Sequence, residues 1–125
     1  MRLLQATALI LGLSMAQAAI SCSCVGVQAY SDKTYLADLF TQADSIVHAR
    51  VLKLVSNHEA HIEVIESFKG RPAVLKAQPG DGAMCGTEFR ADEEAIFVSY
   101  RGQVSLCGRI PASDDLIRRF REYKR

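Results

Sequence analysis

Residues 46–68 read IVHARVLKLVSNHEAHIEVIESF, and this stretch predicts two β-strands joined by a short turn. Its first part, residues 46–55, is rich in apolar and β-branched side chains, which is typical of a strand buried for much of its length. Asn57, His58 and Glu59 predict the turn. Residues 60–68 alternate between apolar and polar until Ile65 and Glu66 break the pattern, which predicts a β-bulge.

Helices are predicted on both sides of the strand region. Residues 31–43 have Ser31 or Asp32 as a cap, and they place Leu36, Leu39, Phe40 and Ala43 on one face. Residues 113–125 begin with Ser113 as a cap, carry acids in the first turn and bases toward the end, and so complement the helix dipole. The apolar face of this last helix consists of Leu116, Ile117, Phe120 and Tyr123.

Further short strands are predicted after the first two, at residues 73–77, 86–90, 95–100 and 103–107, with turn residues between them. Many short strands separated by turns favour a closed or nearly closed antiparallel barrel. The sequence therefore predicts a mainly β fold, a barrel with flanking helices that include one at the C-terminus.

Length and charge restrict the function. The chain has 125 residues, which suits one domain, predicted here over residues 19–125. Of the charged residues only Arg2 lies in residues 1–18, so the remainder carries equal numbers of acidic and basic side chains. Because nucleic-acid binders and polybasic membrane binders need an excess of Lys and Arg, we expect neither partner.

The first 18 residues, MRLLQATALILGLSMAQA, have the pattern of a secretory signal peptide: one basic residue, an apolar stretch and small residues before the cleavage site. The apolar stretch is too short for a comfortable membrane span. An alternative cleavage after Ser21 would release a chain that begins at Cys22. A third possibility is a lipoprotein site with Cys22 acylated, and only this one would put the protein on a membrane. We expect a secreted or periplasmic protein.

Export makes disulfides the expected state of the four cysteines, Cys22, Cys24, Cys85 and Cys107. A Cys22–Cys24 bond would close a very small strained ring, which leaves the two pairings that tie the N-terminus to both distant cysteines. A four-cysteine zinc site is disfavoured, since structural zinc sites use paired Cys-x2–4-Cys knuckles. We therefore expect no metal of the protein's own.

No catalytic constellation is evident, so we expect no enzyme and no cofactor. His58 and His61 lack the HExxH spacing and fall in a turn that enters a strand. His48 lies within a strand, where packing or hydrogen bonding is the more frequent role. Residues 92–94, Asp-Glu-Glu, predict a solvated turn with at most a weak calcium contact.

With these segments in place, the chain resembles the netrin-like module, and more closely the inhibitory N-terminal domain of the tissue inhibitors of metalloproteinases. Cys22-Ser23-Cys24 is similar to the family's N-terminal Cys-x-Cys. The family's other matching segments occur here in order: residues 43–51, ADSIVHARV; residues 62–70, IEVIESFKG; residues 83–86, AMCG; and Leu106-Cys107 with Ile110-Pro111.

The resemblance implies a five-stranded barrel similar to the oligonucleotide/oligosaccharide-binding fold, with disulfides Cys22–Cys85 and Cys24–Cys107. It also implies that the main-chain amine and carbonyl of Cys22 chelate the zinc of a bound metalloprotease. Ser23 would enter the specificity pocket of that protease. Cys24 and Val25 would flank the contact, and Ala83 with Met84 would form the adjoining ridge.

Two functions follow from the resemblance. The first is a secreted, monomeric inhibitor of zinc metalloendopeptidases. The alternative is a netrin-like binding module that is secreted or periplasmic and does not inhibit. Cleavage after Ala18 would leave three residues before Cys22, and its nitrogen would then be an amide that cannot bind zinc. The mature N-terminus therefore discriminates between the two functions.

Overall fold

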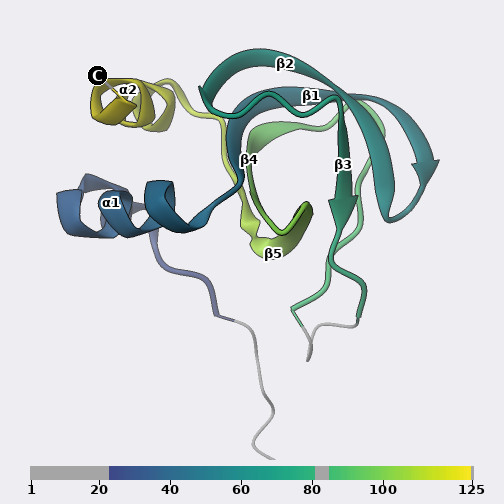
Figure 1. The fold of residues 1–125 in the computed structure, drawn as a ribbon, viewed down its shortest axis with the longest axis horizontal. Coiled ribbons are helices and arrows are strands. Elements are labelled where there is room, and N and C mark those ends of the chain that lie inside the picture. The colour runs from purple at the N-terminus through teal and green to yellow at the C-terminus, as the bar shows by residue number, and fades with distance from the viewer. Residues whose placement is uncertain (1–22, 81–84, 125) are drawn as a thin grey trace, which may run out of the picture.

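The computed structural model describes residues 23–80 and 85–124. The predicted signal peptide and both predicted cleavage sites lie outside these residues. The elements, in chain order, are η1 (Val27–Ser31), α1 (Lys33–Gln42), β1 (Ser45–Ser56), β2 (Glu59–Lys69), β3 (Val74–Ala77), β4 (Glu94–Tyr100), β5 (Gln103–Ile110) and α2 (Asp114–Lys124). Figure 1 shows α1 and α2 together at one end of the strands.

The five strands pair in the order β1-β2-β3-β5-β4, and β4 pairs with β1, so the sheet closes into a ring. The expectation of an antiparallel sheet is wrong at one place, because β3 and β5 run parallel. A closed ring with an odd number of strands cannot alternate direction all the way round. One neighbouring pair must then be parallel, and here it is the short contact of Lys76 and Ala77 with Gln103 and Val104.

The β1–β2 hairpin forms as the sequence predicts, with Asn57 and His58 in its turn. The expected bulge is also present: His48 pairs with Glu66 while the next residue, Ala49, pairs with Val64, which leaves Ile65 extra on β2. Such a bulge increases the bend and twist of the strand. The hairpin can therefore curl from the helices toward the far side of the ring, as Figure 1 shows.

Strand β1 is buried on both faces over its first half, and this creates two cores. Ile46 packs with Phe68, Phe120 and the residues of the two helices. Its neighbour Val47 points to the other face and packs with Phe97 and the interior of the ring. Because successive strand residues face opposite sides, one strand serves both cores. This is why residues 46–49 are all buried.

The two helices begin at the predicted caps. The Asp32 carboxylate accepts a hydrogen bond from the Thr34 backbone N–H at 2.8 Å, and the Ser113 hydroxyl accepts one from Leu116 N–H at 3.2 Å. Phe120 of α2 is completely buried, and its ring centroid lies 5.6 Å from that of Tyr30 and 5.5 Å from that of Phe68. These contacts hold α2 against η1 and β2 together.

One predicted strand is absent from the structure, and another is longer than predicted. Residues 86–90 form no strand: Thr87 N–H donates to Gln78 O and Phe89 N–H to Asn57 O, and no regular ladder connects them to a neighbour. Thr87 and Phe89 are nevertheless buried, and Phe89 packs with Phe97 in the core inside the ring. The strand predicted at residues 103–107 continues to Ile110.

Within the described residues, no helix is long and apolar enough to cross a membrane.

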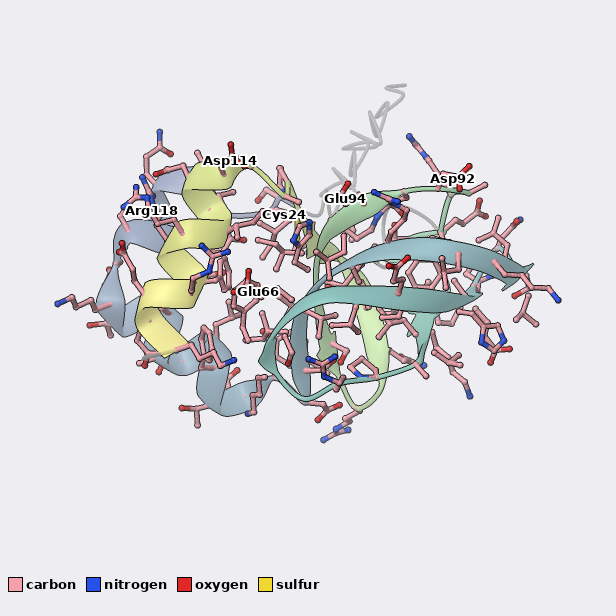
Figure 2. The ribbon with its side chains drawn as sticks, turned by 90° about the horizontal axis from the view of Figure 1, so that it is seen from above. Cys24, Glu66, Asp92, Glu94, Asp114 and Arg118 are labelled. Carbon is pink, nitrogen blue, oxygen red and sulfur yellow. A yellow bond between two sulfur atoms is a disulfide. The ribbon has the colours of Figure 1, made fainter. Side chains whose placement is uncertain are left out.

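Polar contacts fasten α2 to β2. The Arg121 guanidinium donates two hydrogen bonds to the Glu66 carboxylate, at 2.8 and 2.6 Å, and Lys124 Nζ donates to the Ser67 carbonyl at 2.8 Å. Glu66 projects into the space between α2 and the strands (Figure 2). The hydrogen bond with Arg121 lowers the pKa of the Glu66 carboxyl below its ordinary value of 4.5.

We expect this pair to add stability above pH 4.5 and to lose its contribution as the pH falls. A carboxyl whose pKa is lowered by folding takes up its proton more readily in the unfolded chain, so acid favours unfolding. Glu66→Gln should remove about 0.5 kcal/mol of unfolding free energy at pH 7 and much less at pH 3, because the pair is partly exposed. Urea unfolding at both pH values measures this, with Glu63→Gln on the exposed side of β2 as the control. Equal losses at both pH values would contradict the assignment.

Candidate functional site

The Cys24–Cys107 disulfide joins the N-terminal segment to β5, as the resemblance implies. The two sulfur atoms are bonded, and the Cα atoms lie 5.2 Å apart across a sequence separation of 83 residues. Ser23, Cys24 and Val25 are exposed, and none of them belongs to a helix or strand. The segment therefore lies on the surface while one covalent bond fixes its position.

A wide bulge in β5 presents Cys107 to this segment. Phe97 of β4 pairs with Arg109, but Ser99 pairs with Val104, so residues 105–108 stand opposite Val98 alone. The extra length carries Leu106 and Cys107 out of the ladder. Leu106 N–H then donates to the Cys85 carbonyl oxygen at 3.0 Å, and its side chain is 37% exposed.

The chain segments before and after residues 81–84 are held together, and Cys85 begins the second of them. Thr87 N–H donates to Gln78 O at 3.1 Å, and a Cβ added to Gly86 would lie 2.4 Å from the Gly80 carbonyl oxygen. Only glycine permits so close an approach of two backbones. Cys85 itself has a φ of 58° and is disulfide-bonded. Its predicted partner, Cys22, lies outside the described residues, as do Ala83 and Met84.

A partly buried ion pair fixes the chain between Cys85 and β4. Arg109 of β5 pairs with Glu93, and its guanidinium also donates to the Thr87 hydroxyl at 2.7 Å and to the Glu88 carbonyl at 3.0 Å. Burial lowers the pKa of Arg109, with a smaller contribution from nearby Arg90. One side chain of β5 therefore anchors the segment that follows Cys85. The expectation of a solvated turn at residues 92–94 is wrong for Glu93, whose side chain is 13% exposed.

The bulge should depend on Gly108. A Cβ at this position would lie 2.5 Å from the Val98 carbonyl oxygen, so Gly108→Ala forces β5 away from β4. We expect a loss of about 2 kcal/mol in unfolding free energy, a typical cost of overpacking. Gly26→Ala is the control, since the nearest atom to its added Cβ is the flexible end of Gln28. Urea unfolding of both variants compares them, and equal stability would show that β5 adapts without cost.

The structure thus brings together three predicted site residues, Ser23, Cys24 and Val25, with Cys85 and β5. We call the group Ser23, Cys24, Val25, Cys85, Leu106 and Cys107 the disulfide ridge. Leu106 was not predicted as a contact residue. No local signal in the sequence marks it, because its exposure depends on the bulge in β5 opposite Val98.

Other candidate groups do not assemble into a reactive site. His48 is buried, and its Nε2 lies 2.6 Å from Glu94 Oε1, a hydrogen bond that lowers the pKa of the Glu94 carboxyl. This agrees with a packed, hydrogen-bonded histidine. Among residues 23–80 and 85–124, no three histidine, cysteine or acidic side chains are placed to hold a metal ion. His58 and His61 lie on the β1–β2 hairpin, and neither belongs to the disulfide ridge.

Comparisons with protein-family models, with curated proteins and with solved structures found no match for this chain.

Proposed function

We propose that the protein is a secreted inhibitor of zinc metalloendopeptidases, built on a five-stranded ring of the type found in the N-terminal domain of the tissue inhibitors of metalloproteinases. The observation that carries the proposal is the Cys24–Cys107 disulfide, which seats the Cys-x-Cys segment on β5. The hydrogen bond from Leu106 to Cys85 supports it further, because it puts the loop cysteine beside the same segment.

In the proposed mechanism, Cys22 supplies its main-chain nitrogen and carbonyl oxygen to the zinc of the bound protease. A catalytic zinc site keeps one position open for water, and a bidentate ligand in that position removes the nucleophile. The nitrogen must be a free amine in its neutral form, since an amide nitrogen has no available lone pair. The proposal therefore requires cleavage after Ser21, the alternative signal-peptide end, and not after Ala18.

The disulfide ridge supports this mechanism through preorganisation. Immobilising a flexible segment on binding reduces affinity, and a segment already fixed by covalent bonds loses less freedom. The exposed side chains of Val25 and Leu106 offer apolar contact next to the N-terminus. Exposed apolar groups clustered on one face are typical of protein contact sites. Ala83 and Met84 complete the proposed contact.

Secretion is part of the proposal. Disulfides persist in oxidising compartments, and the described residues contain a disulfide that joins the N-terminal segment to β5. The test of function uses the chain from Cys22 to Arg125, folded under oxidising conditions and titrated against a panel of HExxH zinc endopeptidases. We expect competitive inhibition of at least one of them. A chain with both disulfides formed that inhibits none would overturn the proposal.

We expect Ser23 to set selectivity. Its side chain is exposed and has no hydrogen bond within residues 23–80 and 85–124, so replacing it should leave stability unchanged. Ser23→Leu should shift the ratio of inhibition constants between a protease with a deep apolar pocket and one with a shallow pocket by about tenfold, the effect of a few methylene groups in a pocket.

The matched control for this prediction is Lys53→Leu, which puts the same side chain at an exposed position on β1, outside the disulfide ridge. It should leave the ratio unchanged. If both substitutions changed the ratio of inhibition constants equally, Ser23 would not enter the specificity pocket of the protease.

A further inference from the structure

A second candidate site lies between the N-terminal helices and α2, apart from the disulfide ridge. A cavity of about 430 Å³ opens there, and none of its lining residues belongs to the ridge. Cavities of roughly 300–1,000 Å³ are typical of sites for small molecules. The lining combines apolar groups from Tyr30, Leu36 and Tyr123 with the charged groups of Lys33, Arg118 and Arg119.

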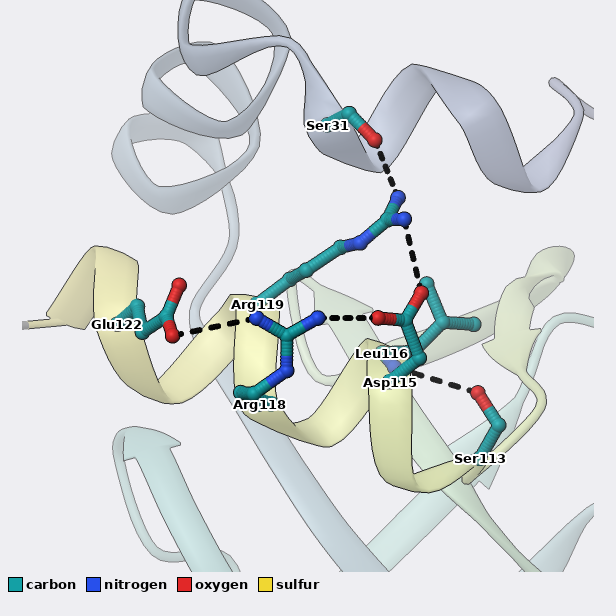
Figure 3. A network of polar contacts seen from close by, with 7 residues as sticks. All are labelled: Ser31, Ser113, Asp115, Leu116, Arg118, Arg119 and Glu122. Atoms are coloured by element: carbon teal, nitrogen blue, oxygen red, sulfur yellow. Dashed lines mark hydrogen bonds and ion pairs between the residues drawn. The ribbon is translucent and has the colours of Figure 1, made fainter.

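Most of the charge around the cavity is already paired. Arg118 contacts the carboxylates of Asp115 and Glu122, and Arg119 lies 2.8 Å from Asp115 while it donates a hydrogen bond to the Ser31 hydroxyl. Figure 3 shows this network, with Arg119 reaching from α2 across to Ser31. Two arginines and two acids therefore balance one another along α2.

Lys33 is the exception among the cations that line the cavity. Its side chain is exposed and has no hydrogen bond or ion pair within residues 23–80 and 85–124. Because Asp115 and Glu122 balance the charges of Arg118 and Arg119, the ammonium of Lys33 leaves this group with an excess of one positive charge. A ligand with a single negative charge would match this excess.

The apolar side of the cavity consists of the rings of Tyr30 and Tyr123 and the side chain of Leu36. Tyr30 and Leu36 are almost completely buried, and Tyr123 packs against Phe40 with 4.7 Å between ring centroids. Burial raises the pKa of Tyr30 to about 12, so its hydroxyl is uncharged at neutral pH and does not repel an anion. Aromatic side chains prefer ring partners in offset or edge-to-face geometry.

We propose that this cavity binds a small aromatic carboxylate, with its ring against Tyr30, Leu36 and Tyr123 and its carboxylate paired with Lys33. An aromatic ring in the ligand would match the tyrosine rings of the lining. A single carboxylate would match the one ammonium that has no ion-pair partner within the described residues. The site does not depend on the inhibitory function, because no ridge residue takes part.

The test is a titration of the chain from Cys22 to Arg125 with 1-naphthoate, followed by calorimetry and by the NMR signals of the tyrosine rings. The neutral analogue 1-naphthylmethanol is titrated in parallel. We expect saturable binding of one naphthoate per chain, shifts confined to Tyr30, Tyr123 and their ring neighbours, and binding of the alcohol that is weaker by about threefold or more, in line with a solvent-exposed ion pair.

Lys33→Gln should weaken naphthoate binding about threefold and Lys33→Glu about tenfold, while leaving the alcohol unaffected. Lys53→Gln, on the exposed part of the β1–β2 hairpin, is the matched control and should change nothing. The proposal is overturned by absence of saturable binding, by equal affinity for acid and alcohol, or by equal effects of the Lys33 and Lys53 substitutions. Since Lys33 is exposed, the variants should remain folded, which circular dichroism checks.

Discussion

A chain that begins at Cys22 should inhibit a susceptible zinc metalloendopeptidase, and one alanine added before Cys22 should raise the inhibition constant by about a hundredfold. The added residue converts the amine of Cys22 into an amide, which can no longer bind zinc. A loss of about 3 kcal/mol is in the range of a dominant interface contact, and it corresponds to that factor in affinity.

Two controls separate the loss of the free amine of Cys22 from any change in the stability of the fold. The extended chain should unfold at the same urea concentration as the chain that begins at Cys22, since Ser23 and Cys24 are exposed and their backbone lies in no helix or strand. Acetylation of the Cys22 amine should reproduce the loss without adding a residue. If the extended or acetylated chain keeps its potency, the chelation mechanism is wrong, whatever the affinity of the parent chain.

Removal of the Cys24–Cys107 disulfide should lower the unfolding free energy by about 4.5 kcal/mol, the value that the chain-entropy model gives for a loop closed over 83 residues. The Cys24→Ala/Cys107→Ala double variant is preferable to chemical reduction, because reduction would also open the disulfide of Cys85. The double variant leaves no free thiol at these positions, so urea unfolding under oxidising conditions measures the contribution of this bond.

The same variant tests the link between scaffold and function. Without the disulfide, Ser23 and Val25 lose their fixed position on β5, and inhibition should weaken even under conditions where the chain stays folded. Ser23→Ala, which keeps both disulfides, is the stability control and should cost almost nothing. A loss below about 1 kcal/mol in the double variant would mean that the N-terminal segment already frays from β5 in the native protein.

Local signals in the sequence are sufficient to predict the β1–β2 hairpin and the first residues of both helices. The run at residues 46–55 and the interrupted alternation at Ile65 depend on side chains within a few residues of one another, and the structure has both the strand and the bulge. The caps Asp32 and Ser113 act on their own first turns. Such features can be predicted because their causes are local.

Features that depend on distant residues could not be predicted in this way. The parallel β3–β5 pair results from closing five strands into a ring, which no single segment encodes. Residues 86–90 have the composition of a strand, yet Thr87 and Phe89 find their partners in Gln78 and Asn57. The pairing of Glu93 with Arg109 likewise requires β5 to lie beside the turn.

In the candidate site, too, the features that depend on distant residues could not be predicted from local patterns. Reasoning from the cysteine spacing left two pairings open, and the Cys24–Cys107 bond came from the resemblance to the inhibitor family. The structure contains this bond. Leu106 was not recognised as part of the ridge, because its exposure depends on a four-residue bulge opposite Val98. A short strand prediction at residues 103–107 gave no reason to expect that bulge.

The most direct test of the central claim is the N-terminal residue of the exported protein, determined by sequencing together with the intact mass before and after reduction. The inhibitor account predicts a chain that begins at Cys22 with a free amine and a mass gain on reduction equal to two disulfides. A chain that begins at Ala19, or one that carries a lipid on Cys22, would have no amine able to bind zinc. Either result would contradict the inhibitor account and favour a netrin-like binding module.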